Sequence, residues 1–248
     1  MPTADVRRID GVAVHVTGSG PAVVLLHANG GSHHDFDAVD WPGHGDSEPL
    51  PTPSACGFAD LLPGLLDALG AGPYTLIGNS LGGFAALRTT ARRPDLVDRL
   101  VLVDPGGFTP RTPLTLGACR LFGTRGFAPT AMRLLPRLYL RRRTPTVAAI
   151  RSALADASRD PVRVQTFARL WRSFTDRRHD ARPDAAAVTA PTLLVWGTRD
   201  PVLPWVVDGR RARRALPRAR VVTLPCGHQA FAELPLEFLA ALHRFLDD

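Results

Sequence analysis

Ser80 is the residue whose setting most clearly predicts chemistry, because it lies between two glycines in the segment 78–82, Gly-Asn-Ser-Leu-Gly. The apolar run 74–77 precedes this segment and a helical pattern follows it. A G-x-S-x-G segment between a strand and a helix is typical of a sharp turn that exposes a nucleophilic serine. The first N–H groups of such a helix favour developing negative charge. We therefore predict that Ser80 is a nucleophile, with an ordinary helix N-cap as the alternative role.

A serine nucleophile needs a base, and the chain carries an acid and a histidine downstream of Ser80. Asp200 follows the strand expected over 191–197, and His228 follows the strand expected over 219–224. Both therefore lie just past the carboxyl end of a strand, the edge where parallel sheets bind ligands. We predict that His228 is the base and that Asp200 orients it. Asp104, which ends another expected strand, is an alternative acid.

These motifs and four further segments carry a family resemblance; the segments are Val23–Gly30, Asp40–Ser47, Leu193–Pro201 and Gly227-His228. The chain resembles the α/β-hydrolase superfamily, in its small capped bacterial esterase-like and lactonase-like branch. The resemblance covers nearly the whole chain and implies the order Ser80, Asp200, His228, which favours Asp200 over Asp104. It also implies an oxyanion hole formed by the backbone N–H groups of Leu81 and Asn29.

The hydrophobic pattern divides the chain into two kinds of sequence. Strand patterns and their helices occupy 1–106 and 188–248, whereas arginine-rich helical segments occupy 107–187. We expect an α/β-hydrolase fold with a mostly parallel central sheet flanked by helices, and a helical cap over 107–187 above its active-site edge. The expected elements include a hairpin over 6–16, a strand over 22–26, helices over 58–69 and 81–92, a strand over 100–104, and helices over 205–216 and 236–246.

The segment between Ala28 and Asp40 is too short for the resembled fold. Only 12 residues separate His27 from Asp40, and a parallel crossover alone needs about a dozen or more. We expect the strand before Asp40 to be largely absent, with weakened stability near the site. Alanine at position 28, where the family has glycine, predicts strain in the oxyanion loop.

Composition limits the partners and the compartment. The net charge is +7, but the 30 basic residues are all arginines and are scattered along the chain, so we expect no nucleic-acid partner. No apolar run reaches membrane-spanning length, and the N-terminal residues lack the apolar stretch of a signal peptide. Three widely spaced cysteines indicate a reducing compartment. We expect a cytoplasmic protein whose partner is a small-molecule substrate; the sequence leaves the oligomeric state open.

Metal and cofactor motifs are not found in the sequence. A histidine- and aspartate-rich stretch lacks any known zinc spacing, so a solvated loop is the better interpretation; its residues are His33, His34, Asp35, Asp37 and His44. Neither G-x-G-x-x-G nor the phosphate-binding G-x-x-x-x-G-K-[ST] occurs, so we expect no nucleotide cofactor.

The leading hypothesis is a cofactor-independent serine hydrolase that acts on a small ester-like substrate through an acyl-enzyme. Hydrolysis of a C–C bond in a diketone is a second hypothesis, because Gly-Asn-Ser also occurs in that branch of the resembled family. A catalytically impaired binding protein is the third, motivated by Ala28 and by the short segment before Asp40.

Overall fold

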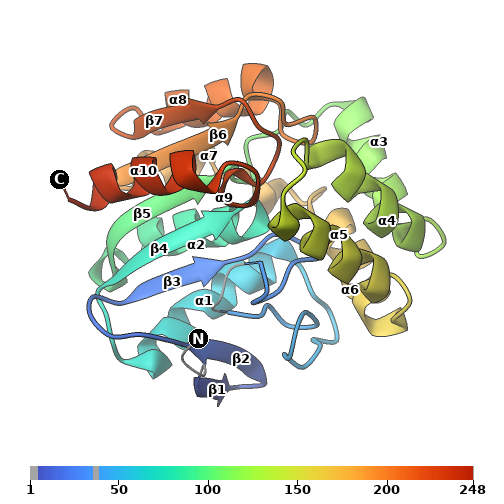
Figure 1. Cartoon of the computed structure of the whole chain (residues 1–248), viewed down its shortest axis with the longest axis horizontal. Coiled ribbons are helices and arrows are strands. Elements are labelled where there is room, and N and C mark those ends of the chain that lie inside the picture. The colour runs from blue at the N-terminus through green and yellow to red at the C-terminus, as the bar shows by residue number, and fades with distance from the viewer. Residues whose placement is uncertain (1–4, 36–38, 248) are drawn as a thin grey trace.

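A computed structural model describes residues 5–35 and 39–247 of the chain. Its centre is a parallel sheet in the order β3-β4-β5-β6-β7 (Figure 1), preceded by an antiparallel hairpin of β1 and β2. The continuous apolar runs form these strands because both faces of the sheet are covered. The α/β-hydrolase fold predicted from sequence is confirmed. The strands are β1 (Asp5–Ile9), β2 (Val12–Val16), β3 (Val23–Leu26), β4 (Tyr74–Asn79), β5 (Val97–Val103), β6 (Thr192–Gly197) and β7 (Arg220–Leu224).

Alternate residues of each central strand enter different cores, as the twofold period of a strand requires. In β5, Leu100 and Leu102 pack with helices α1 (Ala55–Leu69) and α2 (Leu81–Arg92). Their neighbours Val101 and Val103 pack on the opposite face, against the C-terminal helix α10. Helix α10 (Pro235–Leu246) supplies three apolar side chains to that second core, Phe238, Leu242 and Phe245. The sheet edge that carries Ser80 is therefore held from both sides.

The strand expected to be largely absent before Asp40 is reduced to a single residue, Val39. Val39 is fully buried and forms isolated bridges to Val14 of β2, antiparallel, and to Leu26 of β3, parallel. The N–H of Asp40 then donates to the carbonyl of Ala13 at 3.0 Å. One residue thus joins the hairpin to the edge of the parallel sheet.

Helices fill the chain between β5 and β6. Figure 1 shows α3 to α6 beyond the carboxyl ends of the strands, whereas α7 packs against α2. Three of these helices begin at a capping residue followed by proline, namely Thr112, Thr144 and Asp160. Val164, Phe167 and Ala168 of α6 are buried in a core that α6 shares with α4 and α5. The helices are α3 (Pro113–Phe122), α4 (Ala128–Tyr139), α5 (Pro145–Ala157), α6 (Pro161–Ser173) and α7 (Arg182–Ala187).

Two expected helices differ from the structure at their starts. Helix α1 begins at Ala55 rather than at 58, because the Ser54 side chain accepts from the N–H of Gly57 and caps it. The helix expected over 205–216 opens as a π-helical turn, Trp205–Gly209, before α8 (Arg210–Ala215). A Cβ at Gly209 would overlap the Trp205 ring, so this wide turn makes room for the indole. Across residues 5–35 and 39–247, no helix is long and apolar enough to cross a membrane.

Candidate active site

Ser80 occupies the turn between β4 and α2, with the strained backbone angles φ 54° and ψ −111°. Ser80 is the N-cap residue of α2, as the alternative role requires, but its side chain makes no capping hydrogen bond. The neighbouring glycines are needed for close approach. A Cβ at Gly82 would overlap the carbonyl of Leu26, and one at Gly78 would overlap the carbonyl of Gly82. Strain of this kind persists where surrounding structure enforces it, often at functional sites.

His228 and Asp200 meet in the protein interior. His228 Nδ1 lies 2.6 Å from Asp200 Oδ2, and both side chains are buried. The other carboxylate oxygen of Asp200 accepts from the N–H of Val202 at 2.8 Å. Asp200 is therefore fixed at both oxygens, and Nδ1 of the imidazole is engaged, which leaves Nε2 for chemistry.

Asp104, the alternative acid, lies beside this pair but has a different partner. Its Oδ1 accepts from the N–H of Gly197 at 3.0 Å, and its side chain is fully buried. Burial, followed by the negative charge of Asp200, raises the pKa of Asp104 well above its ordinary value. The structure therefore places Asp200, not Asp104, against His228 Nδ1, and disfavours the charged form of Asp104.

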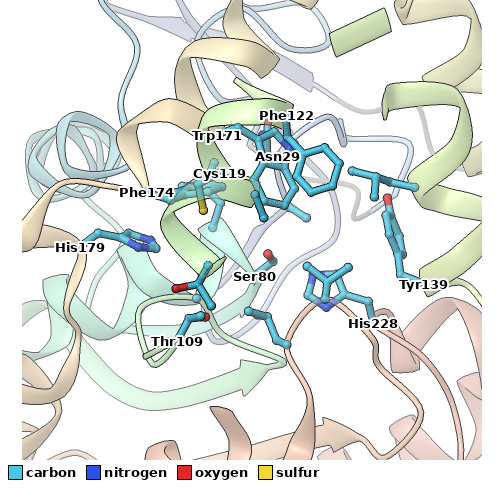
Figure 2. A pocket seen from close by; sticks show the side chains of 18 of the residues that line it. Asn29, Ser80, Thr109, Cys119, Phe122, Tyr139, Trp171, Phe174, His179 and His228 are labelled. Carbon is cyan, nitrogen blue, oxygen red and sulfur yellow. The ribbon is translucent and has the colours of Figure 1, made fainter. Parts of the chain in front are cut away.

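Ser80 and His228 both line one cavity of about 480 Å³ at the carboxyl edge of the sheet, together with Asn29 and Leu81 (Figure 2). Figure 2 shows the Ser80 hydroxyl and the His228 ring facing this space from β4 and from the loop after β7. Among the described residues, no hydrogen bond joins the two side chains. The cavity thus holds every residue predicted for the site except the buried acid Asp200.

The backbone N–H groups of Leu81 and Asn29 donate to no protein acceptor within the described parts of the chain. Both residues line the cavity, and unpaired N–H donors at the cavity wall are what an oxyanion hole requires. The strain predicted at Ala28 is wrong. The only non-glycine residues with positive φ in the described ranges are Asp10, Ser80 and Asp104, and the left-handed turn of this loop falls at Gly30, φ 88°.

Two buried histidines hold the loop that carries Asn29. His27 Nε2 accepts from the N–H of Trp41 at 3.1 Å, and His44 Nε2 accepts from the N–H of Gly30 at 3.1 Å. Burial lowers the pKa of His27 to about 4 and that of His44 to about 3. Both rings are therefore neutral at pH 7 and can act as acceptors.

The solvated loop predicted for the histidine-rich stretch is wrong in part. His44 is buried, and its ring packs beside the rings of His27 and Phe58. His33 is half-buried, with its ring against the Asp40 carboxylate. His34 is exposed, as a solvated loop would have it. Asp37 lies outside the described residues.

Three residues that sequence reasoning missed support the His228 loop. Asn79 Nδ2 donates to the carbonyls of Val103 and His228, at 2.9 and 3.0 Å. The N–H of His228 donates to the carbonyl of Tyr139, at the end of α4, at 2.9 Å. Buried Glu233 accepts from the N–H groups of Arg141 and Arg142, just past the end of α4. The Asn79 position inside the 78–82 segment was the one available signal, whereas the contacts of Tyr139 and Glu233 are visible only in three dimensions.

Comparison with known proteins agrees with this geometry. The family model described as the alpha/beta hydrolase family matches residues 12–242. A 2-hydroxy-6-oxononadienedioate/2-hydroxy-6-oxononatrienedioate hydrolase from a Pseudomonas species is 30% identical, over 92% of this chain and 92% of its own. A pimeloyl-[acyl-carrier protein] methyl ester esterase from Nitrosomonas europaea is 26% identical, over 92% of this chain and 97% of its own.

Solved structures show the same fold. The enol-lactonase from Burkholderia xenovorans LB400 superposes with a TM-score of 0.81 at 21% identity, over 98% of this chain and 100% of its own. The family match spans nearly the whole chain, and the curated relatives named above are hydrolases. This chain belongs to the alpha/beta hydrolase family.

Proposed function

We propose that the protein is a cofactor-independent serine hydrolase that cleaves an ester-like bond in a small, partly apolar molecule. The observation that carries the proposal is the buried His228–Asp200 pair, 2.6 Å apart, beside a strained Ser80 that opens into the same cavity as His228. Family membership supports hydrolysis as the reaction type. Ser80, His228 and Asp200 are the residues to which we assign the roles of nucleophile, base and orienting acid.

In the proposed reaction, Ser80 Oγ attacks the carbonyl carbon while His228 Nε2 takes its proton. The carbonyl π electrons move to oxygen, and the N–H groups of Leu81 and Asn29 stabilise that oxyanion. When the carbonyl re-forms, the alcohol leaves with the proton from His228. Water then attacks the acyl-enzyme with His228 again as base, which releases the acid and restores Ser80. Asp200 keeps its contact with His228 Nδ1 throughout and stabilises the imidazolium.

The cavity walls support a substrate with a substantial apolar part. Apolar side chains from α3, α4 and α6 form one part of the wall, among them Phe122, Met132, Leu135, Phe167 and Trp171. Three buried polar atoms on the lining have no protein partner among the described residues: Asn29 Oδ1, Trp171 Nε1 and His179 Nε2. Burial lowers the pKa of His179 to about 3, so its ring is neutral. These atoms are suited to bind uncharged polar groups of the substrate.

C–C bond hydrolysis is a second candidate. Its support is the Pseudomonas relative, whose name describes a hydrolase of a 2-hydroxy-6-oxo dienedioate, and which matches this chain over nearly its whole length. Three arginines on the cavity lining, Arg111, Arg182 and Arg211, suit a carboxylate-bearing substrate. Turnover of a vinylogous 1,5-diketone dienoate with no turnover of simple esters would favour this candidate over the first.

The third candidate, an impaired binding protein, loses part of its motivation. The expected strain at Ala28 is not found, and Val39 bridges the gap before Asp40. A cytoplasmic setting remains our proposal, supported by three free cysteines, of which Cys56 and Cys226 are buried.

Turnover of p-nitrophenyl butyrate by wild type and by Ser80→Ala tests the leading proposal. We expect the substitution to lower kcat by at least about 10³-fold, because it removes the attacking atom. Ser152→Ala, on the exposed surface of α5, is the matched control and should keep wild-type turnover. Equal turnover by Ser80→Ala and wild type, with both proteins folded by circular dichroism, would reject the proposal.

A further inference from the structure

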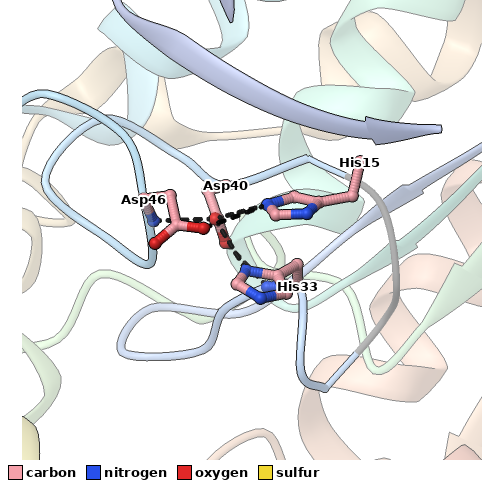
Figure 3. A group of neighbouring side chains, drawn as sticks. All are labelled: His15, His33, Asp40 and Asp46. Atoms are coloured by element: carbon pink, nitrogen blue, oxygen red, sulfur yellow. Dashed lines mark hydrogen bonds and ion pairs between the residues drawn. The ribbon is translucent and has the colours of Figure 1, made fainter. Parts of the chain in front are cut away.

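Four side chains from three separate segments converge where the chain is shortened (Figure 3). His15 comes from β2, His33 lies within the short segment, Asp40 ends that segment, and Asp46 lies in the turn that follows. One potential ligand atom from each residue lies within 4.8 Å of all the others. No role in the proposed reaction uses them, and spacing along the chain does not reveal them because His15 is remote in sequence.

Asp40 is the centre of the cluster. Its Oδ2 lies 3.2 Å from His15 Nε2 and 2.8 Å from His33 Nδ1, and its side chain is fully buried. Oδ2 also accepts from the N–H of Asp46 at 2.9 Å, while Oδ1 accepts from the N–H of His33 at 2.7 Å. A Cβ at Gly45 would overlap this carboxylate, so the turn fits around it closely. Backbone donors of this kind fix the orientation of a metal-binding carboxylate.

We propose that His15, His33, Asp40 and Asp46 bind one divalent transition-metal ion, with Zn²⁺ as the best match. Two imidazoles and two carboxylates are a donor set that zinc accepts, and the two carboxylates balance its charge. Imidazole donors argue against Ca²⁺ and Mg²⁺, which prefer oxygen ligands.

The spacing of the ligand atoms supports four-coordinate binding. A tetrahedral ion with bonds of about 2.0–2.1 Å separates its ligand atoms by about 3.3 Å. The separations of 2.8 and 3.2 Å around Asp40, and of 3.7 Å between His15 Nε2 and Asp46 Oδ2, lie on both sides of that value. Asp46 is the outermost member, with its side chain 54% exposed, and so gives an ion a path from solvent.

Binding also requires one defined movement. The rings of His15 and His33 are stacked, with centroids 3.7 Å apart and planes at 19°. An ion must lie near the plane of each ring that binds it, so the two rings must tilt apart. His15 is held in strand β2, whereas His33 lies in a turn and is the ring that can move. The metal-bound protein should therefore show a wider angle between these rings.

The proposed ion would act on stability and not as a reactant. It would tie β2 to His33 and Asp40, where Val39 and the N–H of Asp40 make the contacts with the strands among the described residues. Asp40 is followed by Trp41, whose indole Nε1 donates to the carbonyl of His27 at 3.0 Å, next to the loop that carries Asn29. The ion would thus stiffen the base of that loop.

The test uses full-length, tag-free protein treated with a chelator and then titrated with Zn²⁺ or Co²⁺. We expect one ion per chain, a Tm rise of about 5–10 °C at a hundredfold excess over Kd, and the intense visible bands of four-coordinate cobalt. Asp46→Asn, at the exposed position, should lower affinity by more than about 100-fold without unfolding the protein, and His33→Gln should do the same. His34→Gln, the adjacent exposed histidine, is the matched control and should bind like wild type.

Three results would overturn the proposal. They are no saturable binding by the folded wild type, equal affinity in Asp46→Asn and wild type, or the weak bands of six-coordinate cobalt. Any of these would leave the cluster as a hydrogen-bond network around Asp40. None would bear on Ser80 chemistry, because esterase turnover is measured separately on the same samples.

Discussion

The backbone N–H of His228 donates to the carbonyl of Tyr139 at 2.9 Å, so the end of α4 holds the proposed base from outside the sheet. The N–H groups of Arg141 and Arg142, just past the end of α4, donate to Glu233 Oε2 at 2.7 and 2.9 Å. Glu233 is buried, and a Cβ at Gly227 would overlap the Tyr139 carbonyl. The helices outside the sheet and the His228 loop therefore form one packed unit.

Glu233→Ala should lower kcat by about 10- to 100-fold with a smaller change in KM, because the His228 loop loses its support. It should also cost about 1–3 kcal/mol of unfolding free energy, since two part-buried N–H groups lose their acceptor. Steady-state kinetics well below Tm and urea denaturation measure the two effects. Glu233→Gln keeps an acceptor oxygen and should recover part of kcat, and Glu237→Ala, exposed on α10, is the control. A wild-type kcat for Glu233→Ala would contradict a positioning role.

Asp104 and Asp200 should respond in opposite ways to amide substitution. Asp200→Asn should lower kcat by about 10⁴-fold, because the amide no longer fixes the His228 tautomer. Asp104→Asn should change kcat by less than about fivefold, since burial and the charge of Asp200 raise the pKa of Asp104 and disfavour the charged form that the amide would remove. Kinetics with p-nitrophenyl butyrate at pH 7 and 8 measure both. A larger loss for Asp104→Asn than for Asp200→Asn would reverse the assignment of the acid.

His44 should make a pH-dependent contribution to stability. Burial lowers its pKa from 6.5 to about 3, so between these values the unfolded chain binds a proton that the folded chain does not. Its contribution is therefore complete above pH 6.5 and is lost as pH falls towards 3. The stability advantage of wild type over His44→Gln should shrink by at most about 2 kcal/mol from pH 7 to pH 5. Urea denaturation at both pH values measures this.

A matched variant checks the histidine result. His243 is exposed on α10, and His243→Gln should show a constant offset from wild type at the two pH values. The contradicting result would be a difference in unfolding free energy between wild type and His44→Gln that stays constant or grows on acidification. His44 would then not be buried in its neutral form.

Gly82 and Gly64 allow a test of close packing at the Ser80 turn. A Cβ at Gly82 would overlap the carbonyl of Leu26, whereas a Cβ at Gly64 meets nothing within 4 Å. Gly82→Ala should lower the free energy of unfolding by about 1–3 kcal/mol and disturb the turn at Ser80. Gly64→Ala, in helix α1, should stabilise by about 0.5–1 kcal/mol through helix propensity. Thermal melts measure the two shifts, and a stabilising Gly82→Ala would contradict the described contact.

Much of the fold follows from local sequence patterns. The apolar runs around Leu76, Leu102 and Leu194 predict buried parallel strands, because each has no polar face to expose to water. Ser80, Asp200 and His228 could be named because each lies just past the end of an expected strand. The short segment before Asp40 was also readable, since chain length alone limits what 12 residues can form.

Other features depend on contacts between remote segments, which a pattern does not contain. The strain expected at Ala28 came from a glycine of the resembled family, but the structure turns at Gly30 instead, held by His44. His15 joins the Asp40 cluster only because Val39 brings the hairpin against the sheet. The support of His228 by Tyr139 likewise requires the packed positions of α4 and β7.

The most direct test of Ser80 as the nucleophile is active-site labelling with a fluorophosphonate, followed by mass spectrometry of the peptides. If Ser80 is a nucleophile activated by His228 and Asp200, we expect one adduct per chain on Ser80 Oγ, slow labelling of Asp200→Asn, and no adduct on folded Ser80→Ala. An unlabelled wild-type protein, or an adduct on another residue with turnover unchanged in Ser80→Ala, would contradict it.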